Sequence, residues 1–194
     1  MAVRIEPIER PPAQDSSRFA TILLLLAGVM FFAGLVGAYL VLRYGSQGFP
    51  APGMPALPVG LAGFNTLVIA VSSLAMRRSV RALRGLDASG LRRGLILTAA
   101  LGAAFLILQA IQWSRLGSSG LSFTGTTYGT TFYVITGAHA VHAFAGVTWL
   151  MVIAFRQREH WVPERRRRSI EACALYWHFV GLVWGGLYIL LYLL

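Results

Sequence analysis

Three histidines lie inside apolar segments long enough to cross a membrane. His139 and His142 lie in the run 132–155, and His178 lies in the run 171–194. Histidines in such segments are rare and usually have a defined partner, because an unpaired polar group is costly in hydrocarbon. Residues three apart share one face of a helix, so His139 and His142 would lie side by side. These imidazoles could ligate a haem or metal, or form hydrogen bonds between helices.

His142 and His178 are expected at comparable depth, because the two segments run in opposite directions and helices rise ~1.5 Å per residue. They could therefore share a buried polar cluster. A haem or metal site is one hypothesis, but only one pair of histidines is available and no carboxylate supports it. We favour a structural role, in which each histidine bonds to a neighbouring carbonyl, hydroxyl or lipid headgroup.

Other polar and small residues in the same segments are also expected to have structural roles. Glu171 is the acidic residue nearest to a span; we expect it to cap a helix N-terminus, with arginine pairing or a lipid headgroup as alternatives. Gly181 and Gly185 form a G-x-x-x-G pair, which allows close helix contact within this chain or with a partner. The candidate structural and lipid-contact residues are His139, His142, Glu171, Tyr176, Trp177 and His178.

The composition indicates an integral membrane protein. Of 194 residues, 56% are hydrophobic and only 12% are charged, whereas a soluble domain carries about a quarter charged residues. All 17 basic residues are arginines, and they lie between apolar runs rather than on one basic face, which argues against nucleic-acid binding. Cys173 is the only cysteine, so neither an internal disulfide nor a cysteine metal cluster is possible.

The hydropathy pattern predicts an all-α bundle of five transmembrane helices. A polar N-terminal tail (1–17) precedes a single membrane domain (18–194). Each predicted span reaches roughly the ~30 Å of the hydrocarbon layer. The arginine-rich stretch 77–93 is expected to be a polar connection. The predicted spans are about 18–43, 58–77, 94–115, 127–156 and 170–194.

The arginines also predict orientation. All but Arg43 and Arg115 lie in the tail, the second connection or the fourth connection. Five spans place these three segments on one side, which the positive-inside rule makes cytoplasmic. The N-terminus is therefore expected in the cytoplasm and the C-terminus outside. The middles of the spans hold no acidic residue or lysine, which disfavours a standalone pump or transporter.

Two motifs in the last two spans resemble subunit III of the haem–copper terminal oxidases. The similarity covers about residues 20–194. In the fourth span the matching residues are Tyr128-Gly129-x-x-Phe132, Thr136-Gly137-Ala138-His139-x-x-His142 and Gly146. In the fifth they are Glu171, Tyr176-Trp177-His178-Phe179-Val180 and Val183-Trp184.

The resemblance implies the five-helix form of a subunit that carries no redox centre. Haem and copper are then expected in the partner catalytic subunit, subunit I, with subunit II as a further partner. The implied role is to stabilise subunit I and hold structural phospholipids during O2 reduction to water, in a prokaryotic plasma membrane. Gly137 and Gly146 are expected at helix contacts. The chain would bind no cofactor and catalyse nothing by itself.

Departures from the family pattern remove most of its acidic groups. Gly28 and Gly181 stand where the family has a glutamate and an aspartate, and Gln112-Trp113 replaces Glu-Tyr. Gly137 to Ala140 also differ from the usual Gly-Phe-His-Gly. Assembly and lipid binding remain expected, whereas direct proton handling does not.

Three related or competing functions stay open. The chain could serve a quinol oxidase or accompany a nitric oxide reductase, because the electron donor and the gas bind other subunits. From a different class, it could be a b-type cytochrome anchor that holds haem through His142 and His178.

Overall fold

The computed structural model describes residues 13–45, 49, 54–157 and 162–194. The described part is helical, with five helices long and apolar enough to cross a membrane. The prediction of an all-α protein with five spanning helices is therefore confirmed. The elements are α1 (Ala13–Gly45), α2 (Val59–Arg84), α3 (Ala88–Ser118), α4 (Thr127–Arg156), α5 (Glu164–Tyr188) and a π-helical turn, η1 (Ile189–Leu193).

The connection between α2 and α3 is much shorter than expected. Stretch 77–93 is mostly helical, because α2 continues to Arg84 and α3 begins at Ala88. Arginine is a good helix former, so both helices extend beyond their apolar parts. The Asp87 carboxylate caps α3 by accepting hydrogen bonds of 2.9 Å from the Gly90 N–H and the Ser89 hydroxyl.

The first and last helices also begin earlier than the hydropathy pattern suggested. Residues 13–17, expected in the irregular tail, belong to α1, while residues 1–12 of that tail lie outside the described residues. α5 begins at Glu164 rather than near residue 170, after Pro163. Proline favours the start of a helix because it lacks the N–H that helix interiors require. α4 spans 127–156, as expected.

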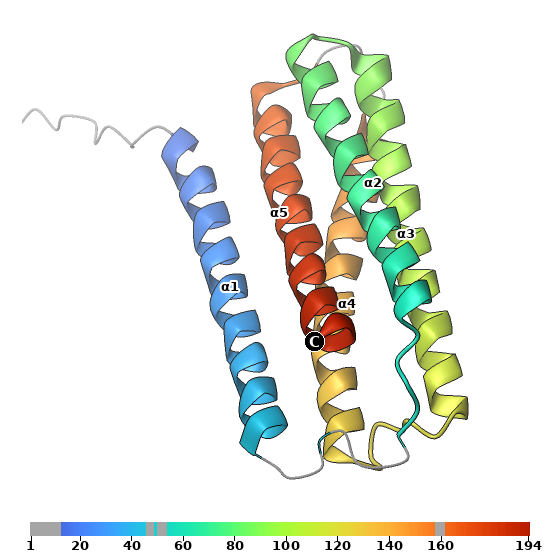
Figure 1. The fold of residues 1–194 in the computed structure, drawn as a ribbon. Helices are drawn as coiled ribbons and strands as arrows, with labels where there is room; N and C mark the ends of the chain where they lie inside the picture. Colours follow the sequence, from blue (N-terminus) through green and yellow to red (C-terminus); the bar gives the residue numbers. More distant parts are fainter. Residues whose placement is uncertain (1–12, 46–48, 50–53, 158–161) are drawn as a thin grey trace, which may run out of the picture.

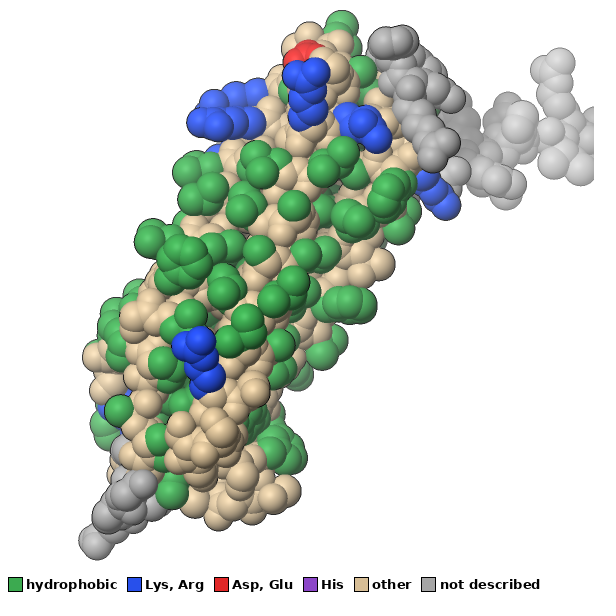
Figure 2. Space-filling model, turned by 90° about the vertical axis from the view of Figure 1, so that its right-hand side faces the viewer, with side chains coloured by type: hydrophobic (Ala, Val, Ile, Leu, Met, Phe, Trp, Pro, Cys, Tyr) green, Lys and Arg blue, Asp and Glu red, His purple; other side chains and the backbone are tan. Residues whose placement is uncertain are grey.

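The helices form a bundle in which α1 lies at one edge. Figure 1 shows α2 and α3 side by side, α5 and α4 next to them, and α1 beyond α5. Only 11% of the most apolar window of α1 is buried, against 33–39% in the other helices. Figure 2 shows one long face on which apolar side chains cover the middle and most basic side chains lie toward one end. Such a surface suits hydrocarbon or a protein partner.

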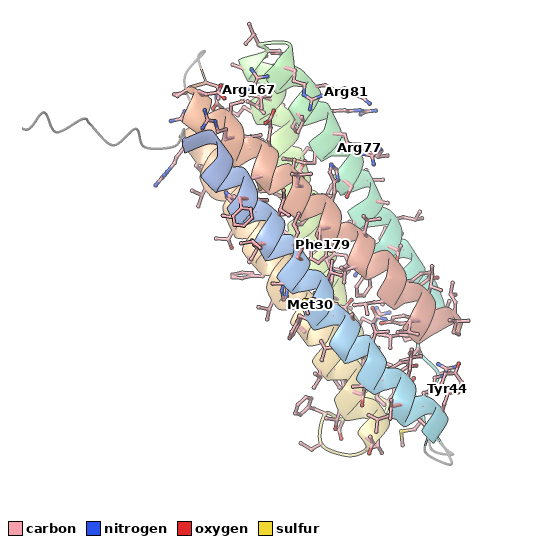
Figure 3. The ribbon with its side chains drawn as sticks, turned by 90° about the vertical axis from the view of Figure 1, so that its left-hand side faces the viewer. Met30, Tyr44, Arg77, Arg81, Arg167 and Phe179 are labelled. Atoms are coloured by element: carbon pink, nitrogen blue, oxygen red, sulfur yellow. The ribbon has the colours of Figure 1, made fainter. Side chains whose placement is uncertain are left out.

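The two ends of the bundle differ in charge. Arg77, Arg81 and Arg167 lie at one end, hereafter the arginine-rich end, and Tyr44 lies at the other, the arginine-poor end (Figure 3). Between them, buried apolar side chains form three clusters along the bundle. Trp177 belongs to the cluster at the arginine-rich end, and Phe105 belongs to the central one. The candidate residues of α4 and α5 lie around these two layers.

Candidate functional site

His139 joins α4 to α5 in the central layer. Its side chain is buried, and its Nε2 atom lies 3.0 Å from the backbone oxygen of Val180. A carbonyl only accepts hydrogen bonds, so Nε2 carries the proton and donates. The imidazole packs between the rings of Phe105 and Trp184, at centroid distances of 5.6 and 5.1 Å. His139 is therefore a buried contact between helices, with Nε2 engaged.

His142 lies one turn further along α4 and faces α1. Its Nδ1 atom lies 2.8 Å from the Ala138 oxygen of its own helix. Its ring stacks on Phe31 of α1 at 5.7 Å and meets Phe32 edge-on at 5.1 Å. The Tyr176 hydroxyl of α5 donates to the His142 backbone oxygen at 3.0 Å. This corner thus ties α1, α4 and α5 together.

Trp177 is the fully buried centre of contacts among four helices. Its Nε1–H donates to the Ser72 hydroxyl of α2 at 3.1 Å, and that hydroxyl donates to the Thr98 oxygen of α3 at 2.9 Å. Glycines of α3 and α4 make room for the indole, because a Cβ would lie 2.6 Å from its ring at Gly102 and 2.8 Å at Gly146. Real Cβ atoms do not approach so closely, so this packing requires both glycines.

His178 is not part of this cluster. It is half-buried on α5 and lies close enough to Arg77 of α2 for an electrostatic interaction. Among the described residues, neither a hydrogen bond nor a ring contact joins it to His139 or His142. Successive helix residues are ~100° apart, so burial of Trp177 turns His178 aside. The expected pairing of His142 with His178 is therefore not formed, and His139 is the histidine of α4 that contacts α5.

The expectation that Glu171 caps a helix is wrong. α5 begins at Glu164, so Glu171 lies about two turns inside it, since a turn holds ~3.6 residues. Its Oε1 atom lies 3.8 Å from Nε of Arg167, one turn earlier, and both side chains are exposed. Of the alternatives, arginine pairing is the one that the geometry shows. An exposed pair of this kind contributes little to stability.

The glycines of the two motifs have different surroundings. A Cβ at Gly181 would lie 3.0 Å from the Ser73 hydroxyl, so Gly181 lies at the contact of α5 with α2. At Gly185 and Gly137, no described atom would lie within 4 Å of a Cβ. Gly28 of α1 meets the Phe179 ring, which would lie 2.9 Å from a Cβ. Figure 3 shows Phe179 on α5 beside α1.

Sequence reasoning missed a second buried polar cluster, between α2, α3 and η1. Asn65 donates from Nδ2 to the Phe105 oxygen at 3.3 Å and to the Gln109 Oε1 atom at 3.5 Å. Gln112 donates from Nε2 to the Tyr192 hydroxyl at 2.8 Å. The i, i+3 spacing of the two glutamines on an apolar helix was the available signal. Gln112 entered the sequence analysis only as a departure from the family pattern.

His139 and His142 each interact with a backbone oxygen, through Nε2 and Nδ1 respectively. No group of three or more His, Cys, Asp or Glu side chains in the described part could hold a metal ion. The arrangement is suited to holding helices together. The Trp177 and His139 contacts join α5 to the rest of the bundle through side chains that sequence motifs had singled out.

A family model and individual relatives of this chain point to the same protein family. The family model described as cytochrome c oxidase subunit III matches residues 8–194. A cytochrome c oxidase subunit 3 of Synechocystis sp. is 35% identical over 181 residues, covering 93% of this chain and 76% of the relative. That of Corynebacterium diphtheriae is 32% identical over 191 residues, covering 97% and 92%. That of Bos taurus is 31% identical over 192 residues, covering 94% and 71%.

Proposed function

The chain belongs to the cytochrome c oxidase subunit III family, and on this premise we propose that it stabilises the catalytic subunit of a respiratory haem–copper oxidase and binds structural phospholipid. One observation carries this proposal. Three polar side chains of its two motifs, those of His139, Tyr176 and Trp177, make hydrogen bonds between helices. They hold a rigid bundle whose outer surface remains apolar. We propose that such a bundle acts on the reaction through the proteins and lipids that it contacts.

The apolar outer face of α1 supports a role in assembly. Large hydrophobic side chains such as Met30, which is 76% exposed, and Val41, which is 72% exposed, point away from the bundle. Figure 3 shows Met30 on the outer side of α1, midway along the helix. Subunits I and II of the oxidase are the proposed protein partners, with haem and copper in the catalytic subunit and no cofactor on this chain.

A groove between α1 and the end of α5 supports phospholipid binding. It has a volume of about 440 Å³, and its lining is almost wholly apolar. Phe32 and Val36 line it from α1, and Val183, Leu187 and Leu190 line it from α5 and η1. An apolar groove within the membrane-spanning part suits an acyl chain better than a polar solute.

The charge difference between the ends supports an orientation. Arg77, Arg81 and Arg167 lie together at the arginine-rich end (Figure 3). We propose that this end and the N-terminus face the cytoplasm of a prokaryotic plasma membrane, since basic loops remain on that side. The C-terminus then lies at the outer surface.

Affinity purification of this chain from native membranes tests the proposal. We expect haem and copper to co-purify with the chain, haem being detected by its absorption spectrum and copper by metal analysis. The purified complex should also consume O2. Supplying cytochrome c or quinol then identifies the electron donor. Haem with non-haem iron and no copper would instead identify a nitric oxide reductase. Stoichiometric haem on the lone polypeptide would overturn the structural role and support a b-type cytochrome anchor.

A further inference from the structure

The buried amides at the arginine-poor end form one connected cluster. Asn65 belongs to α2, Gln109 and Gln112 belong to α3, and Tyr192 belongs to η1. The three amides are 0–1% exposed, and Tyr192 is 8% exposed. Asn65 bonds to Gln109, and Gln112 bonds to Tyr192. The Tyr192 hydroxyl also lies near the Gln109 side chain but makes no hydrogen bond with its Nε2 atom. The cluster therefore joins the last turn of the chain to the α2–α3 pair.

These hydrogen bonds leave three polar atoms unpaired. Within the described residues, Asn65 Oδ1, Gln109 Nε2 and Gln112 Oε1 are buried without a hydrogen-bond partner. Buried polar atoms are nearly always paired, with protein or with ordered water. The hydrocarbon around the bundle offers them no alternative partner.

Turning the amides over does not remove the deficit. If the Asn65 amide is flipped, its oxygen faces the Phe105 carbonyl oxygen, to which Nδ2 donates in the present orientation, and two acceptors cannot bond to each other. If Gln109 is flipped, its amino group faces the Asn65 amino group. If Gln112 is flipped, it accepts from the Tyr192 hydroxyl, but its Nε2 becomes the unpaired atom. Each alternative moves the deficit to another atom.

We propose that this cluster binds an ordered internal water molecule. The unpaired atoms are two acceptors, Asn65 Oδ1 and Gln112 Oε1, and one donor, Gln109 Nε2. A water molecule donates two hydrogen bonds and accepts at least one, so it complements all three. Buried waters typically make about three hydrogen bonds to otherwise unsatisfied groups. No other small ligand is needed to satisfy the cluster.

The π-helical turn gives this water a structural role. η1 follows α5 directly, and it carries the Tyr192 hydroxyl that bonds to Gln112. Single π turns are rare and often occur at functional positions in helices. The water links the α2 amide to the α3 amide that holds Tyr192. It thereby fixes the end of the last helix against the α2–α3 pair.

High-resolution electron cryomicroscopy of the intact oxidase complex tests the proposal directly. We expect a solvent peak within about 2.7–3.2 Å of the three unpaired atoms. Absence of a peak in a map that shows other ordered waters would overturn it. So would a map in which the amides are paired with each other or with a neighbouring subunit.

X-ray radiolytic labelling provides a second readout, because hydroxyl radicals formed from bound water modify adjacent side chains. In the wild-type complex we expect Tyr192 to be labelled, and Asn65→Leu should reduce that labelling several-fold. Ser79→Ala is the matched control, since Ser79 is also buried on α2 but its hydroxyl donates to the Ala75 oxygen of its own helix. Equal Tyr192 labelling in wild type and Asn65→Leu would overturn the proposal. The map of the wild-type complex decides the question even if the variant fails to assemble.

Discussion

The Nε2 atom of His139 lies 3.0 Å from the backbone oxygen of Val180, and this hydrogen bond joins α4 to α5 at the centre of the bundle. His139→Leu removes this hydrogen bond and replaces the imidazole with an apolar side chain that can still fill the buried space. We expect a loss of about 1 kcal/mol in the free energy of unfolding, because bonds between membrane helices contribute ~0.6–1.7 kcal/mol. The haem spectrum of the assembled complex should be unchanged.

Unfolding in a denaturing detergent measures the change in the free energy of unfolding, with His178→Ala as the comparison at a half-buried histidine. Loss of haem from an intact complex would contradict the structural role of these histidines.

Gly146 and Gly137 lie on the same helix and offer a matched pair of substitutions. Gly146→Ala places a Cβ 2.8 Å from the Trp177 ring, whereas Gly137→Ala meets no described atom within 4 Å. We expect Gly146→Ala to destabilise the chain by about 1–3 kcal/mol through overpacking. Gly137→Ala should be neutral or slightly stabilising, because alanine favours a helix by up to ~1 kcal/mol over glycine. Equal unfolding midpoints for the two variants would refute the close packing at Trp177.

Variants of Gly181 and Gly185, the two glycines of the G-x-x-x-G pair, distinguish a helix contact within the chain from a contact with a partner subunit. Gly181→Leu should disturb the α5–α2 contact at Ser73 and reduce the stability of the isolated chain by about 1–3 kcal/mol. A Cβ at Gly185 would meet no described atom within 4 Å, so a chain with Gly185→Leu should fold normally. If Gly185 lies against another subunit, the yield of purified complex will fall while the yield of free subunit does not. An unchanged yield of complex would remove Gly185 from the interface.

The groove between α1 and α5 predicts a change in retained lipid. Gly186 lines it and Gly34 does not. Leucine fits at either position, because neither Cβ would meet a described atom within 4 Å. Gly186→Leu fills space equal to about four acyl carbons, so bound lipid should be weakened by roughly 3 kcal/mol at ~0.8 kcal/mol per CH2. Quantitative lipid mass spectrometry of the purified complex should show loss of phospholipid in Gly186→Leu only. An equal content in both variants would argue against an acyl chain in this groove.

Asp87 predicts a dependence of stability on pH. Hydrogen bonds from the Gly90 N–H and the Ser89 hydroxyl hold the pKa of this carboxyl below its ordinary value of 3.8. Its contribution is therefore complete above that value, and it is lost as the pH falls through the lower pKa of the folded state. Asp87→Asn retains a capping side chain but cannot titrate. Thermal midpoints measured from about pH 6 to about pH 3 should converge for the two proteins as Asp87 is protonated. A constant difference across this range would exclude a role for the charge.

The number and type of the helices could be predicted because membrane crossing depends on local properties. Each span needs ~20 mostly apolar residues, and the segments meet that need without reference to one another. The motifs of α4 and α5 pointed correctly to the family for the same reason, since they are read along the chain. The helix ends at Arg84, Ala88 and Glu164 differed from expectation because polar residues can continue a helix beyond hydrocarbon.

The sequence by itself therefore determined that this protein is a five-helix membrane bundle of the subunit III family. Only the tertiary structure decided which face each helix turns toward its neighbours. Burial of Trp177 turned His178 away from α4, and the π turn of η1 brought Tyr192 to Gln112. Rotation about a helix axis is set by packing against residues distant in the chain, so these pairings could not be read from spacing along one segment.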